Sequence, residues 1–414
     1  MIQKQFPGFQ RYDRSREQAI TRQIILFCTI LLSGGNLIIP RGLLAALSIL
    51  LTMVYLRGSS DTRGIQRKFA YIWLGVVILL SLRQTETADL MATFTRIANF
   101  IVALALLHIY AEEGRENLMT DLTKVITPMT IQAVLTVVFA FVLPNYFMFV
   151  DTPEASFSTF LGVFNFHDVG GSDLLFVRPD GFFFEPGVFQ IYLNILLFIL
   201  LERKRSWLSI FTAILALICL QSTTGFLILG LQLLYFSMKG VSLHKSGLKG
   251  AVRFAVIALV AVGILPFMQS NIEAKLFGNN ASSANARQFD LIAGSMVIAE
   301  HPLLGIGFNH DTYLDISTNY GSDNSKLDAD DQHTGRYTSN GILMAIYTIG
   351  IPLGFVYLLG LVRQELMPHR LLFGMILFLA LSTESLVFTP FFASFALRGL
   401  SFKMPERRSF VKAA

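Results

Sequence analysis

The chain has 414 residues, of which 53% are hydrophobic and only 15% are charged. A soluble protein carries about 25% charged residues, because it must cover its surface with solvated groups. The composition therefore excludes a soluble enzyme, a disordered chain and a nucleic-acid-binding module. The net charge of +5 would suit a nucleic-acid partner, but the distribution of the basic residues along the chain explains it differently.

Apolar segments of helical length recur along the whole chain, without the polar alternation of an outer-membrane barrel. We therefore predict an all-α polytopic membrane protein with 11–12 transmembrane helices, forming a single integral membrane domain over 1–414. The predicted spans are 23–39, 42–56, 69–82, 92–110, 122–143, 182–201, 207–221, 223–238, 251–268, 339–361 and 371–388, with a short twelfth at 389–402.

The basic residues orient these spans. They gather at the N-terminus and in every second short loop, whereas the short loops between them contain only Arg41 and Arg83. Positive residues are enriched in cytoplasmic loops, so we predict a multi-pass protein of the bacterial inner membrane with a cytoplasmic N-terminus. The first apolar run is long enough to span and has no small-residue cleavage pattern, so no cleavable signal peptide is expected.

Two long connections, 144–181 and 269–338, fall on the extracytoplasmic side of this topology. Together they contain fourteen Asp or Glu residues and only five Lys or Arg residues, so each arginine in them stands in an acidic setting. Within the second loop, residues 288–300 have a helical apolar pattern that is typical of a helix lying in the membrane interface. The residues of that pattern are Phe289, Ile292, Met296 and Ala299.

The first candidate cluster ends the first loop, with Arg178, a turn at Gly181, and Glu185 at the start of the next span. A guanidinium held at the membrane surface suits a phosphate, because its planar fork binds two oxygens at once. An ionisable group such as Glu185 at the edge of an apolar segment is a functional candidate, because it is costly to bury. The alternative is that Arg178 and Glu185 simply pair with each other.

The second cluster begins at Arg287 and ends in the glycine-rich stretch His301–His310, which contains Gly305, Gly307 and Asn309. These glycines permit a turn whose exposed N–H groups could bind an anion or a sugar hydroxyl. The alternatives are that Arg287 extends to the lipid headgroups and that His301 caps a helix.

The third cluster lies where the second loop meets the tenth span. It combines the acidic run Asp328–Asp331 with His333 and Arg336, and it ends at Ser339 and Asn340. The carboxylates lack the fixed spacing of a calcium loop, which favours a solvated acidic loop. Ser339 and Asn340 open a helix, for which N-capping is an adequate explanation.

These clusters resemble the bacterial O-antigen polymerase and ligase superfamily, and more closely its Wzy-like polymerase branch. The resemblance covers about residues 175–355, and the first half of the chain is similar only in hydropathy. It rests on Arg178 with Gly181 and Glu185-Pro186-Gly187, on Ser222-Thr223-Thr224-Gly225, on Arg287 with His301-Pro302-Leu303-Leu304-Gly305-Ile306-Gly307, and on Ser339-Asn340 with Gly350 and Gly354.

The resemblance implies a GT-C-like glycosyltransferase that polymerises oligosaccharide repeat units, linked to undecaprenyl diphosphate, into O-antigen or a related surface polysaccharide. Its partners would be the lipid-linked donor and acceptor, membrane lipid, a chain-length regulator and a flippase, with no nucleic acid, cofactor or metal. Arg178 and Arg287 would bind the diphosphates, and Glu185 or His333 would be the general base. The substrate-binding residues would be Arg336, Gly181, Gly305, Gly307, Asn309, Ser339 and Asn340.

Two positions depart from the family pattern. Ligases of the superfamily usually have a His immediately before the residue matched by Asn340, where this chain has Ser339. That difference favours polymerisation, although His333 is close enough to keep a ligase as an alternative. The Ser222 stretch also lacks the arginine that often follows the serine. A polytopic transporter is the alternative from another class, but its polar groups would gather at the membrane midplane on repeated broken helices.

Overall fold

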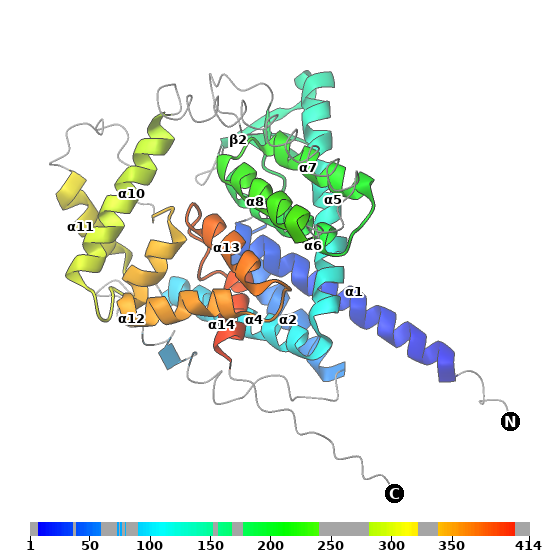
Figure 1. The fold of residues 1–414 in the computed structure, drawn as a ribbon, viewed down its shortest axis with the longest axis horizontal. Helices are drawn as coiled ribbons and strands as arrows, with labels where there is room; N and C mark the ends of the chain where they lie inside the picture. Colours follow the sequence, from blue (N-terminus) through cyan, green and yellow to red (C-terminus); the bar gives the residue numbers. More distant parts are fainter. Residues whose placement is uncertain are drawn as a thin grey trace, which may run out of the picture.

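The computed structural model describes residues 7–35, 39–58, 73, 75–76, 79, 90–151, 156–167, 177–239, 281–321 and 338–401. Within them the protein is mostly helical, which confirms the predicted helical class (Figure 1). The helices are α1 (Pro7–Gly34), α2 (Arg41–Gly58), α4 (Leu90–Glu113), α5 (Arg115–Val142), α6 (Pro186–Glu202), α7 (Trp207–Leu220), α8 (Thr223–Lys239), α10 (Ala281–Glu300), α11 (His310–Gly321), α12 (Gly341–Arg363), α13 (Arg370–Leu381) and α14 (Pro390–Leu400).

Three described helices are long and apolar enough to cross a membrane: α4 from Phe94 onward, α5 and α12. Shorter apolar helices are formed by α6, α7, α13 and the first part of α2. These findings support a membrane protein. The predicted spans at 69–82 and 251–268 lie largely or wholly outside the described residues, so the predicted total of 11–12 spans stays a prediction.

The central helix is α6, in which every residue from Val188 to Leu200 is buried. It begins at Pro186, four residues after the predicted start of the span at 182, because Pro186 stands at its first turn and Glu185 has the extended backbone of an N-cap. Its polar side chains are hydrogen-bonded within the core. Asn194 Nδ2 donates to Gln190 Oε1 at 2.9 Å, and Gln232 Nε2 on α8 donates to Asn194 Oδ1 at 3.1 Å. These bonds join α6 to α8.

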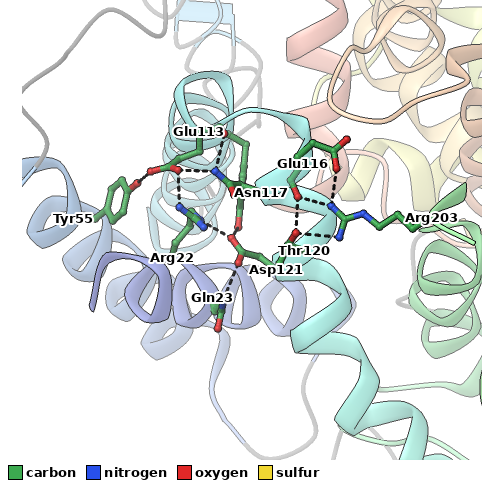
Figure 2. Close-up of polar contacts among 10 residues, drawn as sticks. Arg22, Gln23, Tyr55, Glu113, Glu116, Asn117, Thr120, Asp121 and Arg203 are labelled. Atoms are coloured by element: carbon green, nitrogen blue, oxygen red, sulfur yellow. Dashed lines mark hydrogen bonds and ion pairs between the residues drawn. The ribbon is translucent and has the colours of Figure 1, made fainter. Parts of the chain in front are cut away.

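A buried ionic network joins α1, α2, α4 and α5 at the end of the bundle predicted to be cytoplasmic (Figure 2). Arg22 Nε donates to Asp121 Oδ2 at 2.5 Å, and Arg22 NH1 lies 2.7 Å from Glu113 Oε2. Tyr55 OH donates to Glu113 at 2.5 Å, and Gln23 Nε2 donates to Asp121 at 2.9 Å. We call this the inner clamp, and its acceptors and donors satisfy one another in a buried setting.

A second polar cluster at the same end ties α6 and α8 to α13. Glu202 Oε2 lies 2.9 Å from Lys239 Nζ and 2.8 Å from His369 Nε2, and Tyr235 OH lies 2.9 Å from His369 Nδ1. Burial alone would raise the pKa of Glu202, but the hydrogen bonds and charges of Lys239 and His369 outweigh it. The pKa of this carboxyl therefore lies below its ordinary value.

A four-stranded antiparallel sheet follows α5 and a short 3₁₀ turn, Pro144–Tyr146. It is the main departure from the all-α class expected from the sequence. The strands, in spatial and chain order, are β1 (Met148–Asp151), β2 (Ser156–Phe160), β3 (Phe164–His167) and β4 (Arg178–Pro179). Such short, phenylalanine-rich strands resemble apolar loop sequence, and their pairing depends on residues far apart in the chain.

The C-terminal helices differ from the predicted spans in two places. The helix predicted at 371–388 ends at Leu381, because a polar turn from Ser382 to Glu384 interrupts it. A helix does follow, but α14 has 11 residues, about 16 Å of rise, which is too short to cross the hydrocarbon core alone. Helix α12 is broken at Gly350, whose φ is 80°.

Candidate active site at the outer ends of the helices

Arg178 stands at the edge of the sheet, in the short strand that precedes α6. It pairs with His167 of β3, and Asp180 N donates to Asn165 O at 2.9 Å. Asn165 Nδ2 in turn donates to Gly181 O at 2.8 Å. Gly181 has a φ of +63°, and a Cβ there would lie 2.8 Å from a Phe189 ring atom. The tight turn predicted at Gly181 is therefore confirmed, and it requires glycine.

The Arg178 guanidinium is held between the sheet and α7, where its Nε donates to Leu220 O at 3.1 Å. Burial lowers the pKa of Arg178, and the carboxylates of Asp180, Glu185 and Glu384 act in the opposite direction. Arg178 and Glu185 are therefore neighbours, as are Arg178 and Asp180. A guanidinium has five N–H donors, of which the Leu220 carbonyl takes one.

Glu185 and Glu384 approach each other beside Gly187. A Cβ on Gly187 would overlap Glu384 Oε1 and would lie 3.9 Å from Glu185 Oε2. Glu384 falls within the span predicted at 371–388, but the structure places it in the turn between α13 and α14, 8% exposed. The polar stretch Ser382–Ser385, which interrupts an apolar run, was the signal that could have identified it.

Asp180 is a further carboxyl group of the cluster that sequence reasoning missed. It is 0% exposed, and neither of its carboxyl oxygens has a hydrogen-bond partner among the described residues. Burial raises its pKa well above the ordinary value, Arg178 acts to lower it, and Glu185 acts to raise it. Burial of this carboxyl group therefore favours its neutral form, in which it adds less negative charge around Arg178.

Arg287 comes to the same region from α10. Its side chain is exposed, and its charge lowers the pKa of Arg178, so the two predicted diphosphate-binding arginines are neighbours. Helix α10 is fixed against the start of α12, because Ser339 N and Ser339 Oγ donate to Asp290 Oδ2 at 2.8 and 2.6 Å. Asn340 Oδ1 accepts from the backbone N–H groups of residues 342 and 343, which confirms N-capping at this position.

Residues 288–300 are helical and lie within α10. Ala293 and Val297 are buried against α11 and α12, whereas Ala299 is exposed. At Gly294 a Cβ would lie 3.1 Å from Leu343, so the two helices approach closely at this point. The placement of α10 in the membrane interface stays a prediction.

The glycine-rich turn after α10 does not present the free N–H groups that we expected. Ile306 N donates to Tyr347 O at 2.8 Å, and Gly307 N donates to Thr348 O at 2.9 Å, both on α12. Gly305 N donates to His301 O at 3.1 Å. The turn instead fills the break in α12 at Gly350, where any Cβ would overlap the backbone of Leu303. A substrate-binding role for Gly305 and Gly307 stays a prediction, without these donors.

The remaining predicted site residues are Asn309, His333 and Arg336. Asn309 is buried, and its Oδ1 accepts from Thr312 N at 3.1 Å, so it caps α11. His333 and Arg336 lie outside the described residues. Among the described residues, no group of three or more His, Cys, Asp or Glu side chains has the arrangement of a metal site. The described cluster consists of two arginines, Arg178 and Arg287, and three carboxyl groups, Asp180, Glu185 and Glu384.

Comparison with known proteins gives one match. Residues 208–358 match the family model Wzy_C, described as O-Antigen ligase. The search of curated proteins and the search of solved structures find no match. The matched segment contains Arg287 and Asn340 but ends short of Glu384 and begins after Arg178. It supports a place in the O-antigen polymerase and ligase superfamily, with a part in polysaccharide assembly on lipid-linked glycans, and it does not distinguish the polymerase branch from the ligase branch.

Proposed function

We propose that this chain is a polymerase, which transfers a glycan from one undecaprenyl diphosphate onto a repeat unit carried by another, on the outer face of the inner membrane. The observation that carries the proposal is the convergence of Arg178 and Arg287 beside Glu185 and Glu384. Arg178 and Arg287 lie more than a hundred positions apart in the chain, and the segment that contains Arg287 matches a family model described as O-Antigen ligase.

The cluster suits the charges of this reaction. The acceptor hydroxyl loses its proton to a carboxylate, its oxygen forms a bond to the anomeric carbon, and the bond from that carbon to the diphosphate oxygen breaks. The leaving lipid diphosphate keeps the electron pair, so negative charge grows on it. Arg178 is half-buried, and a fixed guanidinium in a partly dry site stabilises growing negative charge more strongly than one in water.

Glu185 is the general base that the described residues favour. It stands at the N-cap of α6, and its side chain makes no capping hydrogen bond, so the carboxylate remains available. The Glu384 carboxylate lies close to it on the far side of Gly187, so two carboxyl groups flank the place of the acceptor. His333, the other predicted base, lies outside the described residues.

The orientation of the chain belongs to the same proposal. The inner clamp and the Glu202 cluster gather at one end of the helices, whereas the Arg178 cluster gathers at the other. With a cytoplasmic N-terminus, the Arg178 cluster faces the side on which lipid-linked repeat units would be joined.

A ligase of the same superfamily is the second candidate, because the matching family model is described as O-Antigen ligase. Ser339 argues against it. A histidine is usual at this position in ligases, whereas Ser339 here donates both its N–H and its hydroxyl to Asp290. Its contacts therefore support helix packing and leave no imidazole for proton transfer.

The proposal is tested by Arg178→Lys and Arg287→Lys, with Arg203→Lys as the matched control. Arg203 also binds a carboxylate, Glu116 at 2.9 Å, but it does so at the inner end. A lysine keeps the charge and loses the two-pronged contact, so both outer variants should shorten the polymer on a gel of surface glycolipids. Normal polymer length in both, at normal protein levels, would remove the support for diphosphate binding by these arginines.

A further inference from the structure

The hairpin of β2 and β3 has a turn of unusual composition. The turn and its flanks read Phe160-Leu161-Gly162-Val163-Phe164, without a polar side chain. Turns in water are built mainly from Gly, Pro, Asn, Asp and Ser, because these residues pair with solvent or with their own backbone. In this turn Leu161 is 72% exposed in the protein, so an apolar side chain projects from the tip.

The turn lies beside the outer half of α5 (Figure 1). The ring of Phe139 packs against Phe160 and Phe164, at centroid distances of 5.8 and 4.8 Å. Deeper in α5, the Gln132 side-chain amide donates to Val163 O. Gln132 precedes the end of α5 at Val142 by ten residues, about 15 Å of helix rise. The hydrocarbon core is about 30 Å thick, so the turn reaches membrane depth if α5 spans it.

Val163, the last residue of the turn, has partners for both its backbone N–H and its carbonyl. An unsatisfied carbonyl in lipid costs several kcal/mol. Gln132 supplies a donor to the Val163 carbonyl, and Val163 N donates to Phe160 O at 3.2 Å. Strand β2 is paired on both edges, with β1 and with β3. These contacts also account for a glutamine in the middle of an apolar helix.

The opposite end of the hairpin is polar. Asp151 is exposed and its Oδ1 accepts from Ser156 Oγ at 2.5 Å, where β1 and β2 begin to separate. Between these two ends the large apolar side chains of Met148 and Phe149 are exposed together with Tyr146, a residue type that gathers at membrane interfaces. The apolar surface is continuous with that of α5, where Val138 and Phe141 are exposed.

We propose that the β2–β3 hairpin is a re-entrant membrane anchor, with its Leu161–Val163 turn inserted among the acyl chains of the outer leaflet. The anchor fixes the sheet at the membrane surface. Because Arg178 pairs with His167 at the other edge of the same sheet, insertion of the turn also sets the depth of Arg178. The anchor does not depend on the reaction proposed for the Arg178 cluster.

Tryptophan fluorescence tests the anchor. The native Trp73 and Trp207 are first replaced by Phe, and Leu161→Trp or the control Asp151→Trp is added. The full chain is then placed in phosphatidylcholine vesicles, with or without lipids brominated at mid-chain. We expect brominated lipid to quench the emission of Leu161→Trp and to leave Asp151→Trp unchanged. Equal, water-like emission from both variants, unaffected by bromine, would overturn the proposal.

Cysteine labelling provides a second measurement with smaller side chains. The native Cys28 and Cys219 are buried, so they give little background. The reagent is a membrane-impermeant maleimide. We expect Leu161→Cys to resist it in sealed vesicles and to react after detergent solubilisation. In vesicles opened by freeze–thaw, where the reagent reaches both faces of the membrane, we expect Asp151→Cys to react. Labelling of Leu161→Cys in those opened vesicles at the rate of Asp151→Cys would contradict insertion.

Discussion

The inner clamp gives the most quantitative prediction about stability. Arg22 is 7% exposed and contacts two carboxylates, Asp121 at 2.5 Å and Glu113 at 2.7 Å. Arg22→Met would leave the buried Asp121 carboxylate and the partly exposed Glu113 carboxylate without a counter-charge. Removing one member of a buried ion pair costs about 3–5 kcal/mol, and we expect the upper part of that range because two partners are abandoned. Asp121→Asn should cost less, because Glu113 still holds Arg22.

The assay is equilibrium unfolding of the purified chain in mixed micelles, titrated with a denaturing detergent. The matched control is Glu116→Ala, which removes the more exposed pair with Arg203 and should cost no more than about 1 kcal/mol. The loss of unfolding free energy in the double variant Arg22→Met with Asp121→Leu should differ from the sum of the two single losses by about 0.5–3 kcal/mol, because the two side chains interact. The reasoning is refuted if Arg22→Met destabilises no more than Glu116→Ala, or if the double variant is additive.

Three further predictions concern single positions. Gly350→Ala should lower the melting temperature, because φ is +80° and the Leu303 backbone occupies the Cβ position; Gly230→Ala, which has open space, is the control. Gly187→Ala should reduce polymer formation at a normal protein level on a glycolipid gel, because the methyl group displaces Glu384, and an unchanged polymer would contradict it. Glu202→Gln should lower the melting temperature near pH 7, and its difference from the unmodified chain should shrink below pH 4.5. A carboxylate whose pKa is lowered in the folded protein stabilises the fold above its ordinary pKa, and this effect is lost as the group is protonated. A difference in melting temperature that does not depend on pH would contradict this prediction.

Features fixed by local sequence could be predicted. The start of α6 follows from Pro186 after Glu185, and the cap of α12 follows from Asn340 before an apolar run. The tight turn at Gly181 was predicted as well. Each depends on residues within one turn of the position concerned, where backbone geometry and side-chain hydrogen bonding act directly.

Features that depend on distant contacts could not be predicted. Arg22 and Asp121 are 99 residues apart, so only the folded bundle shows that the arginine is buried in a clamp instead of solvated at the membrane surface. Glu384 becomes part of the Arg178 cluster because α13 ends early and turns it toward Gly187. The N–H groups of the glycine-rich turn are occupied because α12 breaks at Gly350, and that break is not evident from glycine alone.

The position proposed for the sheet in the membrane could not be predicted from hydropathy either. Hydropathy assigned residues 144–181 to an aqueous loop, because no run in it is long enough for a helix. A paired hairpin needs only a short apolar turn, and its carbonyl can be satisfied by a side chain such as Gln132 from a neighbouring helix.

The central claim is that the Arg178 cluster joins lipid-linked repeat units, and a gel of surface glycolipids tests it most directly. The samples come from a strain lacking this gene, with and without the gene restored. The account predicts that the long-chain ladder collapses to lipid A core bearing a single repeat unit, and that the restored gene rebuilds the ladder. Accumulation of bare core, with long polymer still on the lipid carrier, would contradict polymerisation and identify the protein as a ligase.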